Sequence, residues 1–236
     1  MLDEEGWYSV TPEAIATQIA ERCRCDVILD AFCGVGGNAI AFARTCERGT
    51  ILSVTIVLFY ANPSPGCDLI VIALDTSPTR LALARHNAAL HGLATRIEFV
   101  LADFRTFAGR MLQPTTSAAP SSTARKIDVV FLSPPWGGPE YLADAEYSLA
   151  RTQPEPAAEL FRLARLLTPN VAFYVPRNTA LEDIASLLPT SVAVNGKESE
   201  AAGEERVEVE EEWMGTKLKA LTCYFGGLAQ GQGHLF

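Results

Sequence analysis

Residues 27–45 read VILDAFCGVGGNAIAFART, and the prediction of the fold starts from this stretch. An apolar run leads into a glycine-rich turn, and the turn leads into a segment with helical character. Continuous apolar runs bounded by turns are typical of strands buried on both faces, and a strand followed at once by a helix is the unit of a parallel sheet. We therefore predict a strand over residues 27–32 and a helix over residues 38–45.

The same alternation continues along the chain. Further strands are expected at residues 68–75, 97–101, 128–132 and 171–175, followed by a terminal pair at residues 207–212 and 219–225. Further helices are expected at residues 12–22, 78–91, 156–167 and 181–188. In the first of these helices, Thr11 is expected to be the N-cap and Pro12 the first helical residue. The prediction is an α/β fold with a mostly parallel seven-stranded sheet and helices on both faces.

Three segments fit poorly into this single domain of residues 1–236. Residues 46–68 are apolar and Pro-rich, at a place where a loop of about 2–6 residues is usual. Residues 113–126 are biased towards Ser, Thr, Ala and Pro, and residues 195–206 towards Gly and Glu. We expect the first segment to be an insertion outside the working fold and the other two to be flexible loops.

The composition limits the partners of the chain. Its formal net charge is −9, whereas proteins that hold long nucleic acids by their phosphates are usually basic. Any nucleic acid is therefore expected to be recognised locally, by stacking and a few cations. The six cysteines lack the spacing of a zinc site and read as reduced thiols of a cytosolic or nuclear protein, so no metal is expected. The N-terminus does not read as a signal peptide, and the apolar run 51–60 is about half of the roughly 20 residues needed to cross a bilayer, so no membrane association is expected.

The glycine-rich turn after the first predicted strand is a candidate ligand site, because ligands of parallel sheets bind at the carboxyl ends of the strands. Gly34 and Gly36 permit positive φ and a close approach of the backbone to a ligand, and the helix that begins near Asn38 presents free N–H groups. Asp30 can accept a hydrogen bond from a ligand amine or can position the loop. A structural tight turn also explains a G-x-G, and a dinucleotide site is disfavoured because Ala39 stands at the third glycine position.

Two further aspartates follow predicted strands. Asp75 is expected to bind ribose hydroxyls, since an acidic residue at this place does so in nucleoside-binding sheets. The structural alternative is that Asp75 caps the next helix, although Ser77 can do so alone. Asp103 can accept a bond from an adenine amine with Phe104 packed nearby, and the alternative is again a helix cap.

The turn SPPWGGP at residues 133–139 is the most specific feature. Its prolines fix φ and lack N–H groups, so a rigid Pro134 carbonyl and the Ser133 hydroxyl can accept hydrogen bonds from an aromatic amine. Trp136 offers a flat face on which a cationic base can stack, whereas a purely structural tryptophan is the alternative. The histidines, which are His86, His91 and His234, are expected at the surface rather than as bases.

These motifs together resemble one known family. DAFCGVGGN at residues 30–38 and SPPWGGPEY at residues 133–141, flanked by WYSVTPE at residues 7–13 and YVPRN at residues 174–178, closely resemble the trimethylguanosine synthase family. The resemblance covers roughly residues 6–225. It implies a class I S-adenosylmethionine-dependent methyltransferase (EC 2.1.1 class) with a Rossmann-like fold. It also implies a monomer in the nucleus (nucleolus or Cajal body) or the cytoplasm, and transfer of two methyl groups, one at a time, to N2 of the 7-methylguanosine cap of small nuclear and nucleolar RNAs.

The resemblance also implies roles for individual residues. The cofactor-binding residues are Thr11, Asp30, Phe32, Gly34, Gly36, Asn38, Asp75, Asp103 and Phe104. The residues at the reacting amine are Ser133, Pro134 and Trp136, and those that bind the cap base or phosphates are Ser133, Trp136, Tyr141, Arg177 and Asn178. No strong base is expected, because the neutral amine attacks the sulfonium methyl in line and loses its proton afterwards. Orientation of the reactants should supply most of the acceleration.

Two departures leave alternatives open. Family members carry a further, partly basic helical segment before the WYSVTPE motif, which this chain is expected to lack, and residues 46–68 interrupt a connection that is tight in the family. One alternative is another nucleobase amino-methyltransferase, acting on ribosomal RNA guanine or on DNA. The other is a catalytically impaired cap-binding homologue.

Overall fold

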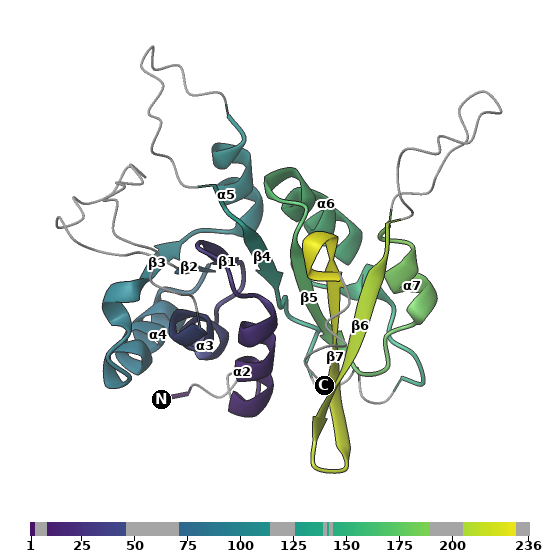
Figure 1. Cartoon of the computed structure of the whole chain (residues 1–236), viewed down its shortest axis with the longest axis horizontal. Coiled ribbons are helices and arrows are strands. Elements are labelled where there is room, and N and C mark those ends of the chain that lie inside the picture. The colour runs from purple at the N-terminus through teal and green to yellow at the C-terminus, as the bar shows by residue number, and fades with distance from the viewer. Residues whose placement is uncertain are drawn as a thin grey trace.

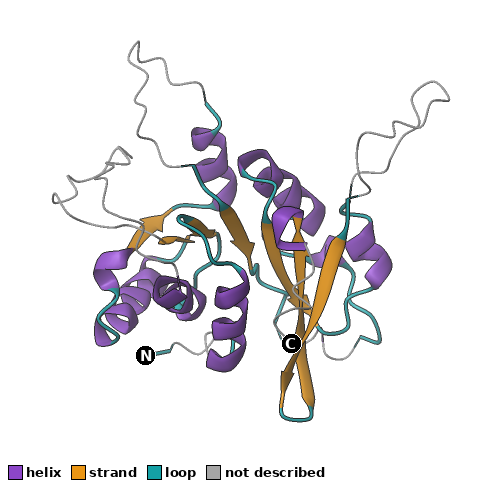
Figure 2. Cartoon of the chain, in the orientation of Figure 1, coloured by secondary structure: helices purple, strands orange, loops and turns teal. Residues whose placement is uncertain are grey.

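A computed structural model describes residues 1–2, 9–45, 71–113, 126–138, 141, 144–188 and 205–229. Within this part the chain forms one mixed sheet flanked by helices (Figures 1 and 2). Residues 46–68, nearly all of residues 113–126, and residues 195–204 lie outside the described residues. The predictions made for those three segments therefore stay predictions.

All seven predicted strands are present. They are β1 (Ile28–Asp30), β2 (Val71–Asp75), β3 (Ile97–Leu101), β4 (Val129–Leu132), β5 (Val171–Pro176), β6 (Val207–Met214) and β7 (Lys217–Phe225). Their order in the sheet is β3-β2-β1-β4-β5-β7-β6. The first five strands pair in parallel, and β7 is inserted antiparallel between β5 and β6. The predicted mostly parallel sheet with a terminal strand pair is confirmed.

The helices divide between the two faces of the sheet. They are α2 (Glu13–Arg22), α3 (Gly37–Thr45), α4 (Pro78–Leu90), α5 (Phe104–Met111), α6 (Ala157–Leu167) and α7 (Leu181–Ala185). Helices α2, α3 and α4 pack against one face through residues such as Ile19, Phe42 and Leu81. Helices α5, α6 and α7 pack against the other through residues such as Phe107 and Leu160. Successive residues of the inner parallel strands enter opposite cores, which explains why those strands are largely apolar.

The start of α2 differs from the prediction. Pro12 is the N-cap, with φ −54° and ψ 140°, and α2 begins at Glu13. The prediction of Thr11 as N-cap and Pro12 as first helical residue is therefore wrong by one position. The buried Thr11 instead accepts a hydrogen bond from the Asn38 side-chain amide at 3.0 Å, so its hydroxyl joins α2 to α3 rather than capping α2.

Helix α5 was not predicted. It has eight residues and borders the compositionally biased segment, so its periodic pattern is short. Phe104, Phe107 and Ala108 are nevertheless buried at the i, i+3, i+4 spacing of one helix face. Helix α7 ends at Ala185, three residues earlier than predicted.

A buried arginine attaches α2 to the terminal hairpin. The Nη1 atom of Arg22 donates to Glu208 at 2.9 Å and to Glu210 at 3.1 Å on β6. Its guanidinium carbon also lies 3.8 Å from the ring centre of Tyr224 on β7. Because Arg22 is almost fully buried, this cluster compensates two carboxylates of the acidic strand β6.

The sheet reverses its direction of winding between β1 and β4. The chain proceeds from β1 outward to β3 and then crosses back to β4 on the other side of β1. The carboxyl ends of strands at such a switch point form the ligand-binding edge of doubly wound sheets. No described helix is long and apolar enough to span a bilayer, and no three potential metal ligands gather among the described side chains.

Candidate active site

Strand β1 ends in a buried carboxylate, that of Asp30. Asp30 is 0% exposed, and its Oδ1 accepts a long bond from the Phe32 amide at 3.4 Å. Its Oδ2 has no hydrogen-bond partner within the described part of the chain. Burial, reinforced by the nearby Asp75 carboxylate, raises the pKa of Asp30 to about 7. A buried acceptor without a partner is unfavourable unless a ligand supplies one, so Asp30 is suited to a ligand amine or cation.

Asp75 joins the turns after β1 and β2. Its Oδ2 accepts from the Gly34 amide at 2.9 Å, and its Oδ1 accepts from the Ser77 amide at 2.7 Å. The N-cap of α4 is Ser77, whose hydroxyl accepts from the Arg80 amide at 3.3 Å, and Pro78 follows at the first helical position. The capping alternative for Asp75 is therefore wrong. Its partly buried carboxylate organises both turns.

Glycine is required at positions 34 and 36 of the turn for two different physical reasons. Gly34 has φ +52°, and a Cβ added there would meet nothing within 4 Å, so the backbone conformation requires glycine and the space beside it is open. Gly36 has φ +89°, and its added Cβ would lie 3.0 Å from the Cβ of Ala84 on α4. Glycine at position 36 is thus needed for close packing of α3 against α4. The open space beside Gly34 is the better place for a ligand.

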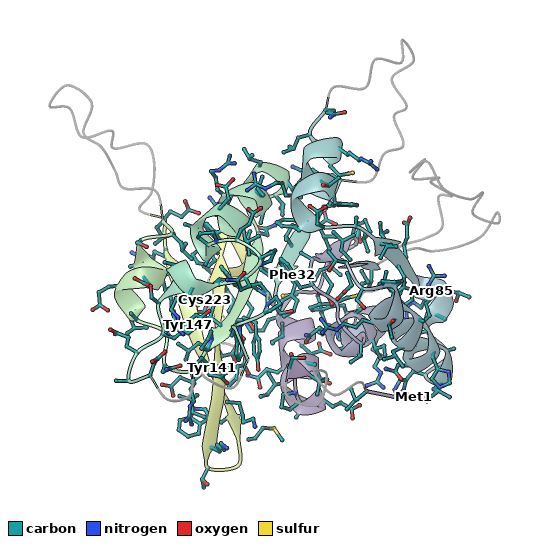
Figure 3. The ribbon with its side chains drawn as sticks, turned by 180° about the vertical axis from the view of Figure 1, so that it is seen from behind. Met1, Phe32, Arg85, Tyr141, Tyr147 and Cys223 are labelled. Carbon is teal, nitrogen blue, oxygen red and sulfur yellow. The ribbon has the colours of Figure 1, made fainter. Side chains whose placement is uncertain are left out.

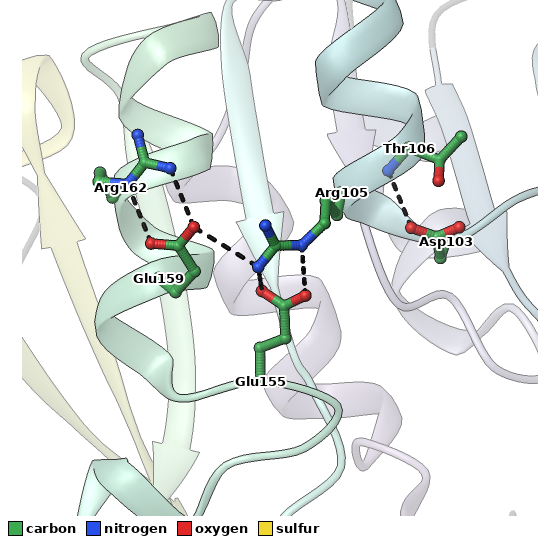
Figure 4. A network of polar contacts seen from close by, with 6 residues as sticks. All are labelled: Asp103, Arg105, Thr106, Glu155, Glu159 and Arg162. Atoms are coloured by element: carbon green, nitrogen blue, oxygen red, sulfur yellow. Dashed lines mark hydrogen bonds and ion pairs between the residues drawn. The ribbon is translucent and has the colours of Figure 1, made fainter.

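Asp103 caps α5, as its structural alternative proposed. Its Oδ1 accepts from the Thr106 amide at 2.8 Å, and this bond holds the pKa of the Asp103 carboxyl below its usual value (Figure 4). Phe104 begins α5 and is buried, with its ring centre 6.1 Å from that of Phe32. Asp103, Phe104 and Phe32 therefore form a wall at the carboxyl ends of β1 and β3.

A charged network fixes this wall to the next helix. Arg105 bonds to both carboxylate oxygens of Glu155, and it lies 3.5 Å from Glu159 on α6 (Figure 4). Arg162 binds the same Glu159 at 2.9 Å. Two residues before Glu155, the Gln153 amide donates to the Pro135 carbonyl at 3.1 Å. The loop before α6 thus contacts both Arg105, which follows the wall of Asp103 and Phe104, and the turn after β4.

The turn after β4 lies beside the turn after β1. The Ser133 hydroxyl donates to the Phe32 carbonyl at a long 3.5 Å, which joins the two turns across the switch point. Pro134 is buried. Gly137 and Gly138 have φ values of +87° and +81°, so the chain reverses sharply after Trp136. The turn that holds Ser133 therefore contacts the turn that follows β1.

Trp136 is part of an aromatic cluster. Its ring centre lies 5.3 Å from that of Tyr174 at 31° and 5.3 Å from that of Tyr141 at 86°. Tyr141 in turn meets the buried Tyr147 edge-on at 6.2 Å. In Figure 3, Phe32 lies in the middle of the molecule, and Tyr141 and Tyr147 lie on the side of the hairpin. The Trp136 side chain is half-buried, and its indole N–H is buried without a hydrogen-bond partner among the described residues.

Two buried residues of this cluster were missed by sequence reasoning. Tyr174 on β5 lies against Trp136, and Glu212 on β6 is 1% exposed. Glu212 accepts a hydrogen bond from Thr222, and burial raises its pKa to about 7. Tyr174 belongs to the quoted YVPRN motif, which was the available signal, whereas Glu212 stands in a run of glutamates that reads as a solvated face.

Arg177 and Asn178 follow β5 and have different surroundings. Arg177 is exposed, and its Nη1 donates to the Leu218 carbonyl on β7 at 3.4 Å. The Asn178 amide donates to the carbonyls of Tyr141 at 3.2 Å and Asp144 at 3.0 Å. Asn178 thereby positions the Tyr141 segment, while Arg177 is a cation beside it.

Comparison with known proteins agrees with this geometry. Residues 68–228 match the family described as RNA cap guanine-N2 methyltransferase. The chain belongs to this family. Trimethylguanosine synthase of Schizosaccharomyces pombe is 33% identical over 78% of this chain and 66% of its own length, and that of Saccharomyces cerevisiae is 29% identical over 78% and 50%. The chain thus spans between half and two thirds of these relatives.

The solved structures support the fold of the RNA cap guanine-N2 methyltransferase family. A putative methyltransferase from Porphyromonas gingivalis superposes with a TM-score of 0.61 at 12% identity, over 96% of this chain and 43% of that one. The predicted class I methyltransferase fold is confirmed by this likeness together with the strand order. The cofactor of such enzymes is S-adenosylmethionine, as the sequence predicts.

Proposed function

We propose that this protein transfers methyl groups from S-adenosylmethionine to N2 of the 7-methylguanosine cap of small nuclear and nucleolar RNAs. Two successive transfers would give the 2,2,7-trimethylguanosine cap. The observation that carries the proposal is the direct contact between two turns: the glycine turn with the isolated Asp30 meets the Ser133–Trp136 turn through the Ser133–Phe32 hydrogen bond. Family membership and the trimethylguanosine synthases among the relatives support the choice of guanine N2.

The described residues fit the cofactor. Asp30 offers the cationic amino acid end a buried oxygen that has no partner among the described residues, and Asp75 offers partly exposed oxygens to the ribose. Phe104, Phe32 and Asp103 offer an apolar wall and a carboxylate to the adenine. When bound, the cofactor supplies an electrophilic methyl group on a sulfonium.

The residues on the other side of the site would hold the base. Trp136 stacks on the methylated guanine, whose positive charge is attracted to the face of the indole ring. Ser133 and the Pro134 carbonyl orient the exocyclic amine, and the neutral nitrogen lone pair attacks without prior loss of a proton. The acceleration then comes chiefly from alignment, which can contribute about 7–11 kcal/mol when reacting groups are held well. Thr11 and Asn38 position the glycine-turn helix, and Arg177 and Tyr141 serve the cap phosphates.

A monomer that acts in the nucleus on capped RNA is the cellular context that this proposal implies. The substrate assignment is tested by transfer of labelled methyl groups to m7GDP and to GDP by the purified chain. We expect one and then two methyl groups on m7GDP and none on GDP. Transfer to both nucleotides alike would favour a ribosomal RNA or DNA enzyme. Binding of m7GDP without transfer would show a catalytically impaired homologue.

A further inference from the structure

The terminal hairpin carries an exposed aromatic surface next to the site. Strands β6 and β7 extend past the carboxyl ends of the parallel strands and form the protruding yellow hairpin of Figure 1. Near its tip, Trp213 is 50% exposed and Met214 is 42% exposed. Only residues 215 and 216 connect the strands, and Gly215 has φ +60°, which suits a tight hairpin turn. A large aromatic side chain is thus held out on a short, well-defined support.

This surface is continuous with the proposed cap site. Trp213 pairs across the hairpin with Leu218, whose carbonyl accepts the hydrogen bond from Arg177. Arg177 is also close enough to Tyr141 to act on the pKa of its hydroxyl, which burial raises and the guanidinium lowers. Tyr141 packs edge-on against Trp136. An aromatic ring, a cation and a second aromatic ring therefore follow one another from the cap site to the hairpin tip.

Trp213 lies on the same face of the sheet as the aromatic residues of the proposed cap site. Glu211, two residues before Trp213, pairs with Leu221, which enters the core on the side of α6 and α7. Tyr141 packs against that same core. The pairing of β6 with β7 is irregular between Glu212 and Trp213, so alternation by itself does not place the Trp213 side chain. The Trp213 indole N–H donates to Glu211 at 3.0 Å, and this bond keeps Trp213 on the face of Glu211, which is the side of the sheet on which Tyr141 packs.

The local charge differs from that of the whole chain. Of the four glutamates on β6, Glu208 and Glu210 are paired with Arg22, and the exposed Glu211 accepts the hydrogen bond from the Trp213 indole N–H. Glu212 is buried, and its raised pKa reduces its negative charge near neutrality. Three basic residues flank the hairpin tip, namely Arg177, Lys217 and Lys219. The protein is acidic overall, yet this edge offers cations beside a flat apolar ring.

We propose that the β6–β7 hairpin binds the first nucleotides that follow the cap. The proposal rests on the proposed function and extends its site. A base of single-stranded RNA stacks on Trp213, while Arg177 and Lys217 contact the phosphates between that base and the cap. Such a pairing of stacking platforms with cations is how proteins hold single strands without reading sequence. The hairpin would thus distinguish a capped RNA chain from a free cap nucleotide.

The test compares two ligands, m7GDP and a capped, unstructured oligoribonucleotide of ten residues. Since stacking of one more base adds to the affinity, we expect the wild-type protein to bind the capped oligonucleotide about tenfold more tightly than m7GDP. Trp213→Ala should remove most of this difference and leave the affinity for m7GDP and transfer to it unchanged. Trp213→Phe should restore it. Lys217→Gln should lower the slope of log affinity against log salt by about 0.7 for the oligonucleotide alone.

The control variant is Leu166→Ala. Leu166 is also exposed, but it lies in the last turn of α6. This turn precedes β5 and therefore lies at the amino ends of the parallel strands, away from the hairpin tip. Leu166→Ala should change neither affinity. The proposal is overturned if the two ligands bind equally tightly to the wild-type protein, or if Trp213→Ala weakens both. It is also overturned if Trp213→Ala changes only the self-association of the protein, because the surface would then bind a second copy of the chain rather than RNA. Failure to discriminate m7GDP from GDP would instead count against the proposed function.

Discussion

The two sides of the switch point use different physical means. On the proposed cofactor side, around β1 to β3, the carboxylates of Asp30, Asp75 and Asp103 accept hydrogen bonds from backbone amides of short turns. On the proposed cap side, around β4, β5 and the hairpin, the rings of Trp136, Tyr141 and Tyr174 pack against one another. One side is a frame of hydrogen bonds and the other a cluster of aromatic rings. The difference suits a polar cofactor on one side and a flat cationic base on the other.

The largest expected effect is on the cap side. Trp136→Ala should abolish measurable binding of m7GDP, because it removes stacking worth about 1–3 kcal/mol together with cation–π attraction. Cofactor affinity should stay nearly unchanged. Calorimetric titration of each ligand into the variant measures both. A variant that still prefers m7GTP to GTP would show that the comparison of the two sides is wrong.

The next effect is on the cofactor side. Asp75→Ala removes the acceptor of the Gly34 amide and of the proposed ribose contact, and should weaken cofactor binding by about 1.5–3 kcal/mol. Binding of m7GDP should change much less. Asp75→Asn is the matched control for shape, since it keeps an acceptor but loses the charge. Unchanged cofactor affinity in folded Asp75→Ala protein would limit Asp75 to organising the turns.

A smaller effect is expected in the pH dependence. The pKa of Asp30 is raised to about 7 in the free protein, so Asp30 binds a proton in the folded chain that it loses when unfolded between about pH 4 and 7. Its contribution to the free energy of unfolding should therefore fall as the pH rises through this range. A cationic ligand group favours the carboxylate, so cofactor binding should release a proton near pH 6.5 and become tighter towards pH 8.

Calorimetry at pH 6.5 in two buffers of different ionisation enthalpy measures this proton release. The apparent binding enthalpy should differ between the buffers for the wild-type protein and not for Asp30→Asn. Equal enthalpies for the wild-type protein would mean that Asp30 does not meet a cationic group.

The smallest effect is expected at the link between the two sides. Arg105→Ala removes the network with Glu155 and Glu159, and exposed ion pairs contribute little to stability because solvent screens them. The free energy of unfolding from urea titration should therefore fall only slightly. Arg162→Ala removes only the contact with Glu159 and should have less effect. A clear loss of cofactor affinity in Arg105→Ala would show that the wall of Asp103 and Phe104 depends on the network.

Most of the sheet and its turns could be predicted from the sequence alone. The seven strands, the Ser77 cap and the two turns that meet at the switch point are local in origin, because each depends on a few consecutive residues. The resemblance to the trimethylguanosine synthase family, carried by the turns, was confirmed by the family match.

The remainder of the site depends on contacts between distant parts of the chain. Gly36 packs closely against Ala84 on another helix, and Thr11 accepts a hydrogen bond from Asn38 rather than capping its own helix. Tyr174 lies against Trp136 because β5 pairs with β4, and Glu212 lies near Tyr174 because β7 inserts between β5 and β6. These contacts join residues far apart in the chain, and packing in three dimensions selects such partners whereas local periodicity carries no information about them.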